Sequence, residues 1–346
     1  MKHLQKLTAL SLAVLMCLAV LTACGNNSGA ASGSGSSTAA GSSSTETFTP
    51  TDYRVAALKG PTAMGLVKLM SDSDSGAATQ NKYTFKIAAS ADEITPALIQ
   101  GDLDIACVPA NLASVLYNKT KGGVQVLAVN TLGVLYIVEN GNAVKSVADL
   151  SGKTIVAAGK GSTPEYALRY LLKANGINPD TDVTIDWKSE HSECVSALAS
   201  GAATIALLPQ PFVTVAQTKI SNLRVALDLT KEWDALNNGS ALLTGVVVAR
   251  TEAVKENPGA IDAFLQEYLD SVNWVNANVA DAAKLVGSYD IVDAAVAEKA
   301  IPNCNIVCIT GSEMKDKLSG YLTVLNDQNP QSVGGTLPND DFYYGT

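Results

Sequence analysis

Residues that could carry out acid–base or nucleophilic chemistry are sparse in this chain. Only two histidines occur, His3 and His191, so a Ser-His-Asp arrangement in the body of the chain has to use His191. The segment 191–194 (His-Ser-Glu-Cys) offers zinc ligands three residues apart on a helix. A histidine at the surface or at the rim of a pocket is the better interpretation, and we expect no catalytic residue, no metal site and no cofactor.

Two further motifs match known reactive patterns only in part. Residues 312–315 read Ser-Glu-Met-Lys, the Ser-x-x-Lys pattern of penicillin-interacting enzymes, but the companion Ser-Asp-Asn and Lys-Thr-Gly motifs are missing. A helix capped by Ser312 explains this segment better. Residues 152–154 end like a phosphate-binding loop, but Val147 stands where the first glycine is required. The start of a strand is the better interpretation.

Hydroxyl and amide side chains, in contrast, stand where predicted strands give way to helices. N–H groups at helix starts favour anionic groups, and a nearby hydroxyl can add a hydrogen bond. Simple helix capping is an equally good explanation of each hydroxyl, and one residue can do both. We predict a ligand site that draws on Thr62, Met64, Ser90, Asn111, Thr131, Ser162, Thr163, His191, Gln210 and Thr244.

An internal repeat indicates how these residues are positioned. Residues 97–109 and 197–209 both read Ala-Leu-x-x-Gly-x-x-x-Ile-Ala-x-x-Pro. They are preceded by Lys-Gly-Pro-Thr at 59–62 and Lys-Gly-Ser-Thr at 160–163, in the same order. Ala-Leu-x-x-Gly is also a common helix ending, but the shared order of two motifs favours two α/β lobes of similar build.

Alternating strand and helix patterns predict an α/β fold with a mostly parallel sheet in each lobe. The predicted strands are 53–58, 83–88, 105–108, 124–129, 135–139, 184–187, 205–208, 223–227 and 246–249. The predicted helices are 62–70, 93–100, 111–117, 162–175, 261–276, 280–286, 294–300 and 313–325. Ligands of such sheets bind beyond the carboxyl ends of the strands, so facing lobes would hold a small molecule between matching loops.

The beginning of the chain reads as an export signal. Lys2 and Lys6 precede an apolar run at 7–20, which is shorter than a membrane span. Leu21-Thr22-Ala23-Cys24 then looks like the lipobox of bacterial lipoproteins, where cleavage leaves Cys24 lipidated. An ordinary signal peptide or an uncleaved anchor are the alternatives. Residues 25–47 are almost all Gly, Ser, Ala, Thr and Asn, which predicts a flexible tether.

Composition excludes some classes of function. The chain has 346 residues and a formal net charge of −9, with 33 acidic and 24 basic residues. No basic patch is present, so nucleic-acid binding is not expected. Of six cysteines, Cys107 falls in a buried strand, and Cys304 and Cys308 could pair only across a turn. The cysteine pattern therefore predicts no set of disulfide bonds.

Several segments together resemble a known family. They are the lipobox, the tether, and the stretches ALIQGDLDIA (97–106), SVADLSGKTI (146–155) and GSTPEYALRYLLKANGI (161–177). The chain resembles the periplasmic-binding-protein-like substrate-binding lipoproteins of ABC importers, in the nitrate, sulfonate, taurine and thiamine-precursor branch. Thiamine-precursor synthases share this fold but use a histidine and a cysteine-rich motif, and no such cluster is seen here.

The resemblance implies two lobes that open and close around two crossovers, near Thr131 and Thr244. It places a signal peptide at 1–23, a tether at 24–50, the first lobe at 51–131 and 245–346, and the second at 132–244. It implies a monomer outside the cytoplasm, lipid-anchored to the membrane, that captures a small anionic or heterocyclic solute for an ABC permease and its ATPase. An anchored enzyme on the same fold, using Asp92, Glu165, Glu190 and His191, or a sensor subunit are the alternatives.

Overall fold

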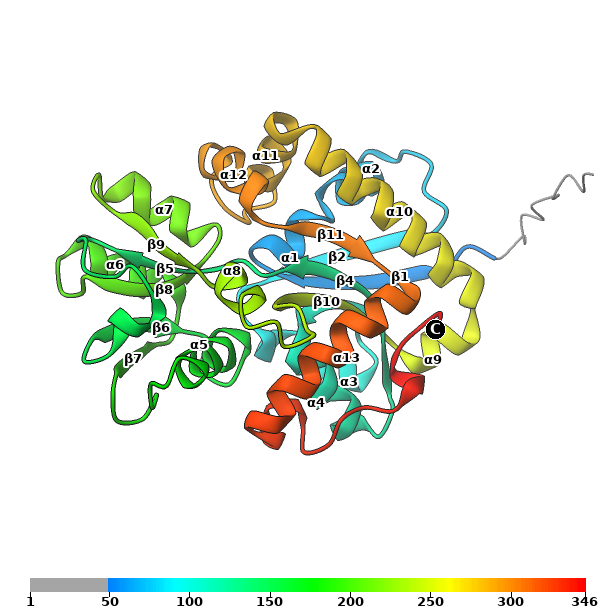
Figure 1. Ribbon diagram of the computed structural model, residues 1–346. Coiled ribbons are helices and arrows are strands. Elements are labelled where there is room, and N and C mark those ends of the chain that lie inside the picture. Colours follow the sequence, from blue (N-terminus) through cyan, green and yellow to red (C-terminus); the bar gives the residue numbers. More distant parts are fainter. Residues whose placement is uncertain (1–48) are drawn as a thin grey trace, which may run out of the picture. The chain divides into compact units, whose positions relative to one another are not determined.

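A computed structural model describes residues 49–346 of the chain. The predicted signal peptide, the predicted lipidation site Cys24 and nearly all of the predicted tether lie outside the described residues. The described residues form one compact unit, which contains two β-sheets flanked by helices (Figure 1). The predicted α/β fold with two lobes is thereby confirmed.

The first lobe is built on a six-stranded sheet in the order β11-β4-β10-β3-β1-β2. Its strands are β1 Asp52–Leu58, β2 Lys82–Ala88, β3 Ile105–Pro109, β4 Val124–Leu132, β10 Leu243–Arg250 and β11 Ile306–Ile309. The second lobe is built on a five-stranded sheet in the order β7-β6-β8-β5-β9. Its strands are β5 Leu135–Glu139, β6 Thr154–Ala158, β7 Thr184–Lys188, β8 Ile205–Pro209 and β9 Arg224–Asp228.

Strand pairing is mixed, not mostly parallel as predicted. β1 pairs in parallel with β2 and β3, whereas β10 is antiparallel to both β3 and β4. In the second sheet β6 is parallel to β7 and β8, whereas β5 is antiparallel to β8 and β9. β11 is likewise antiparallel to β4. The reversed strands β5 and β10 are the first that the chain forms after each crossover. Each enters its lobe from the side of the other lobe, so it runs against the neighbouring strands.

The helices cover both faces of the sheets (Figure 1). In the first lobe they are α1 Pro61–Met64, α2 Val67–Ser75, α3 Thr95–Gln100, α4 Ala110–Thr120, α9 Thr251–Glu256, α10 Pro258–Ala277, α11 Val279–Ser288, α12 Ala294–Ala300 and α13 Gly311–Gln328. In the second lobe they are α5 Thr163–Ala174, α6 His191–Ala199, α7 Phe212–Lys219 and α8 Leu229–Asp234. Among the described residues, none of these helices is long and apolar enough to cross a membrane.

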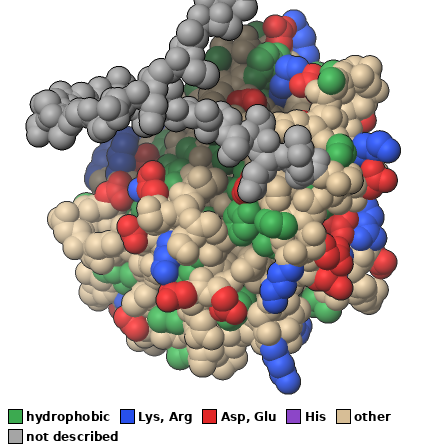
Figure 2. Space-filling view, turned by 90° about the vertical axis from the view of Figure 1, so that its right-hand side faces the viewer, with side chains coloured by type: hydrophobic (Ala, Val, Ile, Leu, Met, Phe, Trp, Pro, Cys, Tyr) green, Lys and Arg blue, Asp and Glu red, His purple; other side chains and the backbone are tan. Residues whose placement is uncertain are grey.

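The late helices α10, α11 and α13 pack on the six-stranded sheet. Along β1, Val55 and Ala57 pack in the core shared with α2, α10 and α11, whereas Ala56 packs in the core shared with α3, α4 and α13. This alternation follows from the two-residue period of a strand. On the face of the molecule shown in Figure 2, acidic and basic side chains are interspersed over the surface.

Some elements differ from the prediction. The helix expected at 62–70 is divided into α1 and α2 around Gly65, where a Cβ would lie 2.8 Å from Tyr268 Oη. Helix α7 was not predicted, because the β-branched residues among 212–219 are poor helix formers and only packing on α6 and β8 selects the helix. The four cysteines among residues 49–346 are all unpaired, so Cys304 and Cys308 form no disulfide there.

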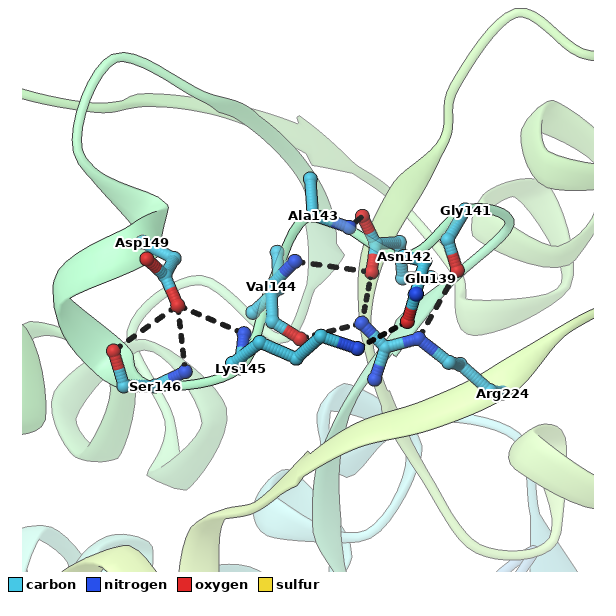
Figure 3. Close-up of polar contacts among 9 residues, drawn as sticks. All are labelled: Glu139, Gly141, Asn142, Ala143, Val144, Lys145, Ser146, Asp149 and Arg224. Atoms are coloured by element: carbon cyan, nitrogen blue, oxygen red, sulfur yellow. Dashed lines mark hydrogen bonds and ion pairs between the residues drawn. The ribbon is translucent and has the colours of Figure 1, made fainter.

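A polar network fixes the loop that follows β5 (Figure 3). Glu139, which is buried, accepts hydrogen bonds from the N–H groups of Ala143 and Val144 at 2.9 and 3.2 Å, and pairs with Arg224 on β9. Arg224 also donates to the carbonyl of Gly141 at 3.0 Å. The loop is therefore held to the edge strand of the second sheet by one buried carboxylate.

The internal repeat corresponds to equivalent strands of the two lobes. β3 and β8 have the same burial pattern, and each ends at a proline, Pro109 or Pro209. Because the chain crosses between the lobes after β4 and before β10, the carboxyl ends of these strands lie toward the crossovers. The domain boundaries at 131/132 and 244/245, and hinge bending there, stay predictions.

Candidate functional site

A cavity of about 200 Å³ lies where the two lobes meet. The two repeated loops contribute Lys59 to Thr62 from the first lobe and Ser162 to Pro164 from the second. Pro109 and Pro209, at the ends of the repeated strands, lie on its wall as well. The remaining lining residues are Leu58, Ala89, Val134, Leu135, His191, Gln210, Phe212 and Thr244. Matching loops of both lobes thus enclose one small space.

The predicted site residues divide into two groups. The first group lines the cavity and consists of Thr62, Ser162, Thr163, His191, Gln210 and Thr244. The second group, Met64, Ser90, Asn111 and Thr131, is placed elsewhere. Sequence periodicity placed these residues near the ends of strands and the starts of helices, but it did not decide which way each side chain points.

Each residue of the second group has a structural role. Met64 is fully buried in the core against α10, and Thr131 is fully buried with its hydroxyl bonded to Asn130 Oδ1 at 3.0 Å. Ser90 is exposed and forms a capping box with Glu93. Asn111 donates from Nδ2 to two carbonyl oxygens, that of Ser332 at 3.1 Å and that of Gly161 at 3.5 Å.

The loop before α1 turns Thr62 toward the cavity. Its hydroxyl donates to the carbonyl of Leu58 at 3.0 Å, which leaves the oxygen lone pairs available as acceptors. The methyl group lies against β10, where a Cβ on Gly245 would approach Thr62 Cγ2 to 2.6 Å. Glycine at 245 therefore makes room for Thr62.

In the second lobe the start of α5 contributes two hydroxyls. Ser162 Oγ donates to the carbonyl of Gly159 at 2.8 Å. Thr163 Oγ1 accepts a hydrogen bond from Tyr321 Oη, which belongs to α13 of the first lobe, over 3.2 Å. Tyr321 is a residue that sequence reasoning missed, because nothing in a regular helix 158 residues downstream points to α5.

Among the residues that line the cavity, Gln210, Thr244 and His191 carry polar groups with few hydrogen-bond partners in the described part of the chain. Gln210 Oε1 accepts from the hydroxyl of Thr214 at 2.9 Å, which orients the amide and leaves its NH₂ group as a donor. Thr244 Oγ1 and His191 Nδ1 are both buried without a hydrogen-bond partner among the described residues. Buried polar groups without partners are rare in proteins, so these two atoms are the best candidates for ligand contacts.

His191 is held uncharged. Burial lowers the pKa of its imidazole from 6.5 to about 4, because a charged ring loses its hydration inside the protein. The ring packs against Phe212, with 5.2 Å between the ring centroids. At neutral pH the imidazole has one donor and one acceptor nitrogen.

A larger hollow of about 720 Å³ lies at the other end of the first sheet, at the starts of β1 and β2. Its central charged groups are paired with one another: Asp104 bonds to Arg54 at 2.7 Å and to Arg250 at 3.1 Å. It is lined by the first lobe alone. We therefore take the smaller cavity between the lobes as the candidate site.

The residues considered for catalysis do not come together. Of Asp92, Glu165, Glu190 and His191, only His191 lines the cavity. Within residues 49–346 no group of three or more His, Cys, Asp or Glu side chains could hold a metal ion.

Comparison with known proteins identifies the family. Residues 76–274, more than half of the 346-residue chain, match the family described as "ABC transporter, phosphonate, periplasmic substrate-binding protein". The chain belongs to this family. A binding protein of Brucella abortus is 26% identical over 207 residues, which cover 60% of this chain. The chain spans 61% of the length of that curated relative.

Solved structures show the same fold. An ABC transporter protein from Parabacteroides distasonis superposes with a TM-score of 0.71 at 23% identity, covering 84% of this chain and 98% of that one. The periplasmic aliphatic sulphonate binding protein SsuA of Escherichia coli superposes with a TM-score of 0.66 at 17% identity, covering 83% and 96%. Members of the family are periplasmic substrate-binding proteins of ABC transporters, which agrees with the resemblance drawn from the sequence.

Proposed function

We propose that this chain captures a small solute, anionic or heterocyclic, between its two lobes outside the cytoplasm and delivers it to an ABC permease and its ATPase. The observation that carries the proposal is the cavity of about 200 Å³ lined by equivalent loops of both lobes. One molecule in that space contacts both lobes at once. Binding therefore stabilises a closed arrangement over an open one.

The proposal includes no chemical step. The cavity contains hydroxyls, one amide and an uncharged imidazole, but no carboxylate lines it. A binding protein needs no nucleophile or acid–base pair, since it releases the solute unchanged. Within the proposal the monomer acts alone, without a cofactor.

Membrane attachment is the second part of the proposal. Leu21-Thr22-Ala23-Cys24 supports a lipid anchor on Cys24, preceded by a cleaved signal peptide. Labelling of cells with radioactive palmitate is expected to mark the wild-type chain and not Cys24→Ser. Label retained in Cys24→Ser would contradict the anchor without affecting the binding site.

Solute capture is tested on the full-length chain with a thermal-shift screen of small metabolites, followed by calorimetry. A compound at ~100 times its Kd stabilises the folded state by about 2.7 kcal/mol, which is readily detected. Gln210→Ala is expected to weaken a stabilising compound by roughly two- to twelvefold, the range for one neutral hydrogen bond.

The matched control is Gln266→Ala, which removes a glutamine from the exposed surface of α10. It is expected to leave the affinity unchanged. Small-angle scattering should also show a more compact chain with the compound bound. If no metabolite stabilises the chain, or if Gln266→Ala weakens binding as much as Gln210→Ala, the cavity is not the site of capture.

A further inference from the structure

The cavity offers no free charge to a ligand. Lys59 is the one charged residue among those that line it. Its Nζ lies 2.7 Å from the carboxylate of Asp290, at an exposed position. The rest of the wall is apolar or carries uncharged polar groups, including four prolines and Phe212. An ion inside would lose its hydration without gaining a counter-ion.

Backbone N–H groups are the usual substitute for basic side chains in anion sites. Here some N–H groups in the loops next to the cavity are already bonded to carboxylates of the chain itself. Glu165 Oε2 accepts from the N–H of Gly161 at 2.7 Å, beside the lining residue Ser162. Glu93 Oε1 accepts from the N–H of Ala89, itself a lining residue, at 3.1 Å.

The start of α6 follows the same pattern. Glu193 Oε2 accepts from the N–H groups of Ser189 and Glu190 at 2.9 and 3.4 Å, directly before the lining residue His191. Three loops beside the cavity thus each carry a carboxylate that accepts hydrogen bonds from backbone N–H groups, although none of these carboxylates lines the cavity itself.

Helix α5 is the longest helix that begins at the cavity. Its positive end would favour an anion, but the carboxylate of Glu165 lies in its first turn. A second negative charge at this place would be repelled by the first, and more strongly than in water because the site is partly desolvated.

The groups that remain for a ligand are neutral. His191 Nδ1 belongs to the second lobe, whereas Thr244 Oγ1 lies near the crossover into β10, and neither has a partner among the described residues. Gln210 adds a free NH₂ group. Together they can both donate to and accept from one molecule.

We propose that the solute of this cavity is a small molecule without net charge that both donates and accepts hydrogen bonds, and not a phosphonate or sulfonate. The inference rests on the proposed function and specifies its ligand. A cavity of roughly 150 Å³ can hold benzene, and this one has about 200 Å³. A single-ring compound with one or two polar substituents fits this space, and Phe212 offers its ring for packing.

The test is a thermal-shift panel on the full-length chain. It contains single-ring carboxamides, each paired with its own carboxylate (benzamide with benzoate, nicotinamide with nicotinate, and analogous pairs), with methylphosphonate and ethanesulfonate added. Stabilisation is expected from uncharged members only. Thr244→Val is expected to weaken it by roughly two- to twelvefold, as for loss of one neutral hydrogen bond.

A second arm asks whether the carboxylates exclude anions. Glu165→Gln keeps the shape of the side chain but removes its charge, so methylphosphonate should stabilise this variant more than it stabilises wild type. The control, Glu313→Gln, removes a carboxylate from the first turn of α13, which does not line the cavity. The comparison uses the shift in melting temperature that the ligand causes in each protein. A change in the stability of a variant itself therefore does not affect the result.

The outcomes separate this inference from the proposed function. If an anion stabilises wild type but not Thr244→Val, the inference that the solute carries no net charge is wrong. Solute capture in this cavity is then still supported. A panel in which no compound stabilises the chain contradicts both. An equal response of wild type, Glu165→Gln and Glu313→Gln to methylphosphonate, including no response, contradicts the role given to Glu165.

Discussion

The hydroxyl of Tyr321 donates a hydrogen bond to Thr163 Oγ1 over 3.2 Å, and so connects α13 of the first lobe to the first residue of α5 in the second. Both residues are buried. The Tyr321 ring also packs on Trp233 of the second lobe, with 5.7 Å between ring centroids. Since Thr163 lines the cavity, this contact joins the ligand site directly to the interface between the lobes.

Replacing Tyr321 by Phe is expected to weaken the closed arrangement. The ring and its packing stay, while the buried Thr163 hydroxyl loses a partner, at a cost of about 0.5–1.5 kcal/mol. The free energy of unfolding should fall by that amount in urea titrations. Small-angle scattering of the ligand-free variant should give a larger radius of gyration than wild type.

Tyr117→Phe is the control for this prediction. Its hydroxyl donates to Asp341, and both residues belong to the first lobe. It is expected to change stability without changing the radius of gyration. If Tyr321→Phe also leaves the radius unchanged, then the hydrogen bond does not hold the lobes together.

His191 makes stability depend on pH. Its pKa is 6.5 when exposed and about 4 in the folded chain, because burial disfavours the charged ring. Below pH 6.5 the unfolded chain therefore binds a proton that the folded chain does not, and stability falls as the pH drops from 6.5 to 4. The loss attributable to His191 approaches about 3 kcal/mol.

The measurement compares urea unfolding of wild type and His191→Gln between pH 7.5 and 4. Glutamine does not titrate, so the free energy of unfolding of wild type should decline more steeply over the interval below pH 6.5. Parallel curves for the two proteins would show that the imidazole is solvated in the folded chain.

The sequence indicated the loops near the cavity better than the side chains that line it. Lys-Gly-Pro-Thr and Lys-Gly-Ser-Thr, together with the repeated Ile-Ala-x-x-Pro strands, located the loops that line the cavity, because turns and caps are encoded locally. The directions of the side chains are not local. Met64 enters the core and Asn111 bonds to Ser332 because of how distant segments pack.

The same reason explains what was missed. Phe212 lies on a helix that its β-branched neighbours do not predict, and Tyr321 reaches α5 only through the return of the chain to the first lobe. The reversed strands β5 and β10 likewise depend on the direction from which the chain enters each lobe. A strand pattern carries no information on that direction.

Glu139 is expected to be a main determinant of stability in the second lobe. Burial by itself would raise the pKa of this carboxyl, but hydrogen bonds from Ala143, Val144 and Arg224 lower it overall, below its ordinary 4.5. The charged form is therefore bound more tightly in the folded chain. Its contribution is present above pH 4.5 and is lost as the pH falls through the lowered pKa.

Glu139→Gln is expected to lower the free energy of unfolding at pH 7 by about 1–3 kcal/mol, because Arg224 and two N–H groups lose a charged acceptor. The difference from wild type should shrink below pH 4.5. Glu298→Gln, an exposed carboxylate on α12, is the control and should change stability little. A difference that does not depend on pH would indicate that packing, not charge, is what Glu139 supplies.

Gly245 is expected to tolerate no side chain, because it lies between Thr62 and Asn130. A Cβ there would approach Asn130 Oδ1 to 2.5 Å and Thr62 Cγ2 to 2.6 Å. Gly245→Ala should therefore displace Thr62 toward the cavity and destabilise the fold by about 1–3 kcal/mol, as for other overpacked positions.

Gly320→Ala is the matched control, since its nearest neighbour lies at 3.4 Å and alanine favours a helix interior by up to about 1 kcal/mol. Urea titrations of both variants decide the matter: Gly245→Ala as stable as wild type would mean that β10 moves freely away from Thr62, and that this wall of the cavity is not rigid.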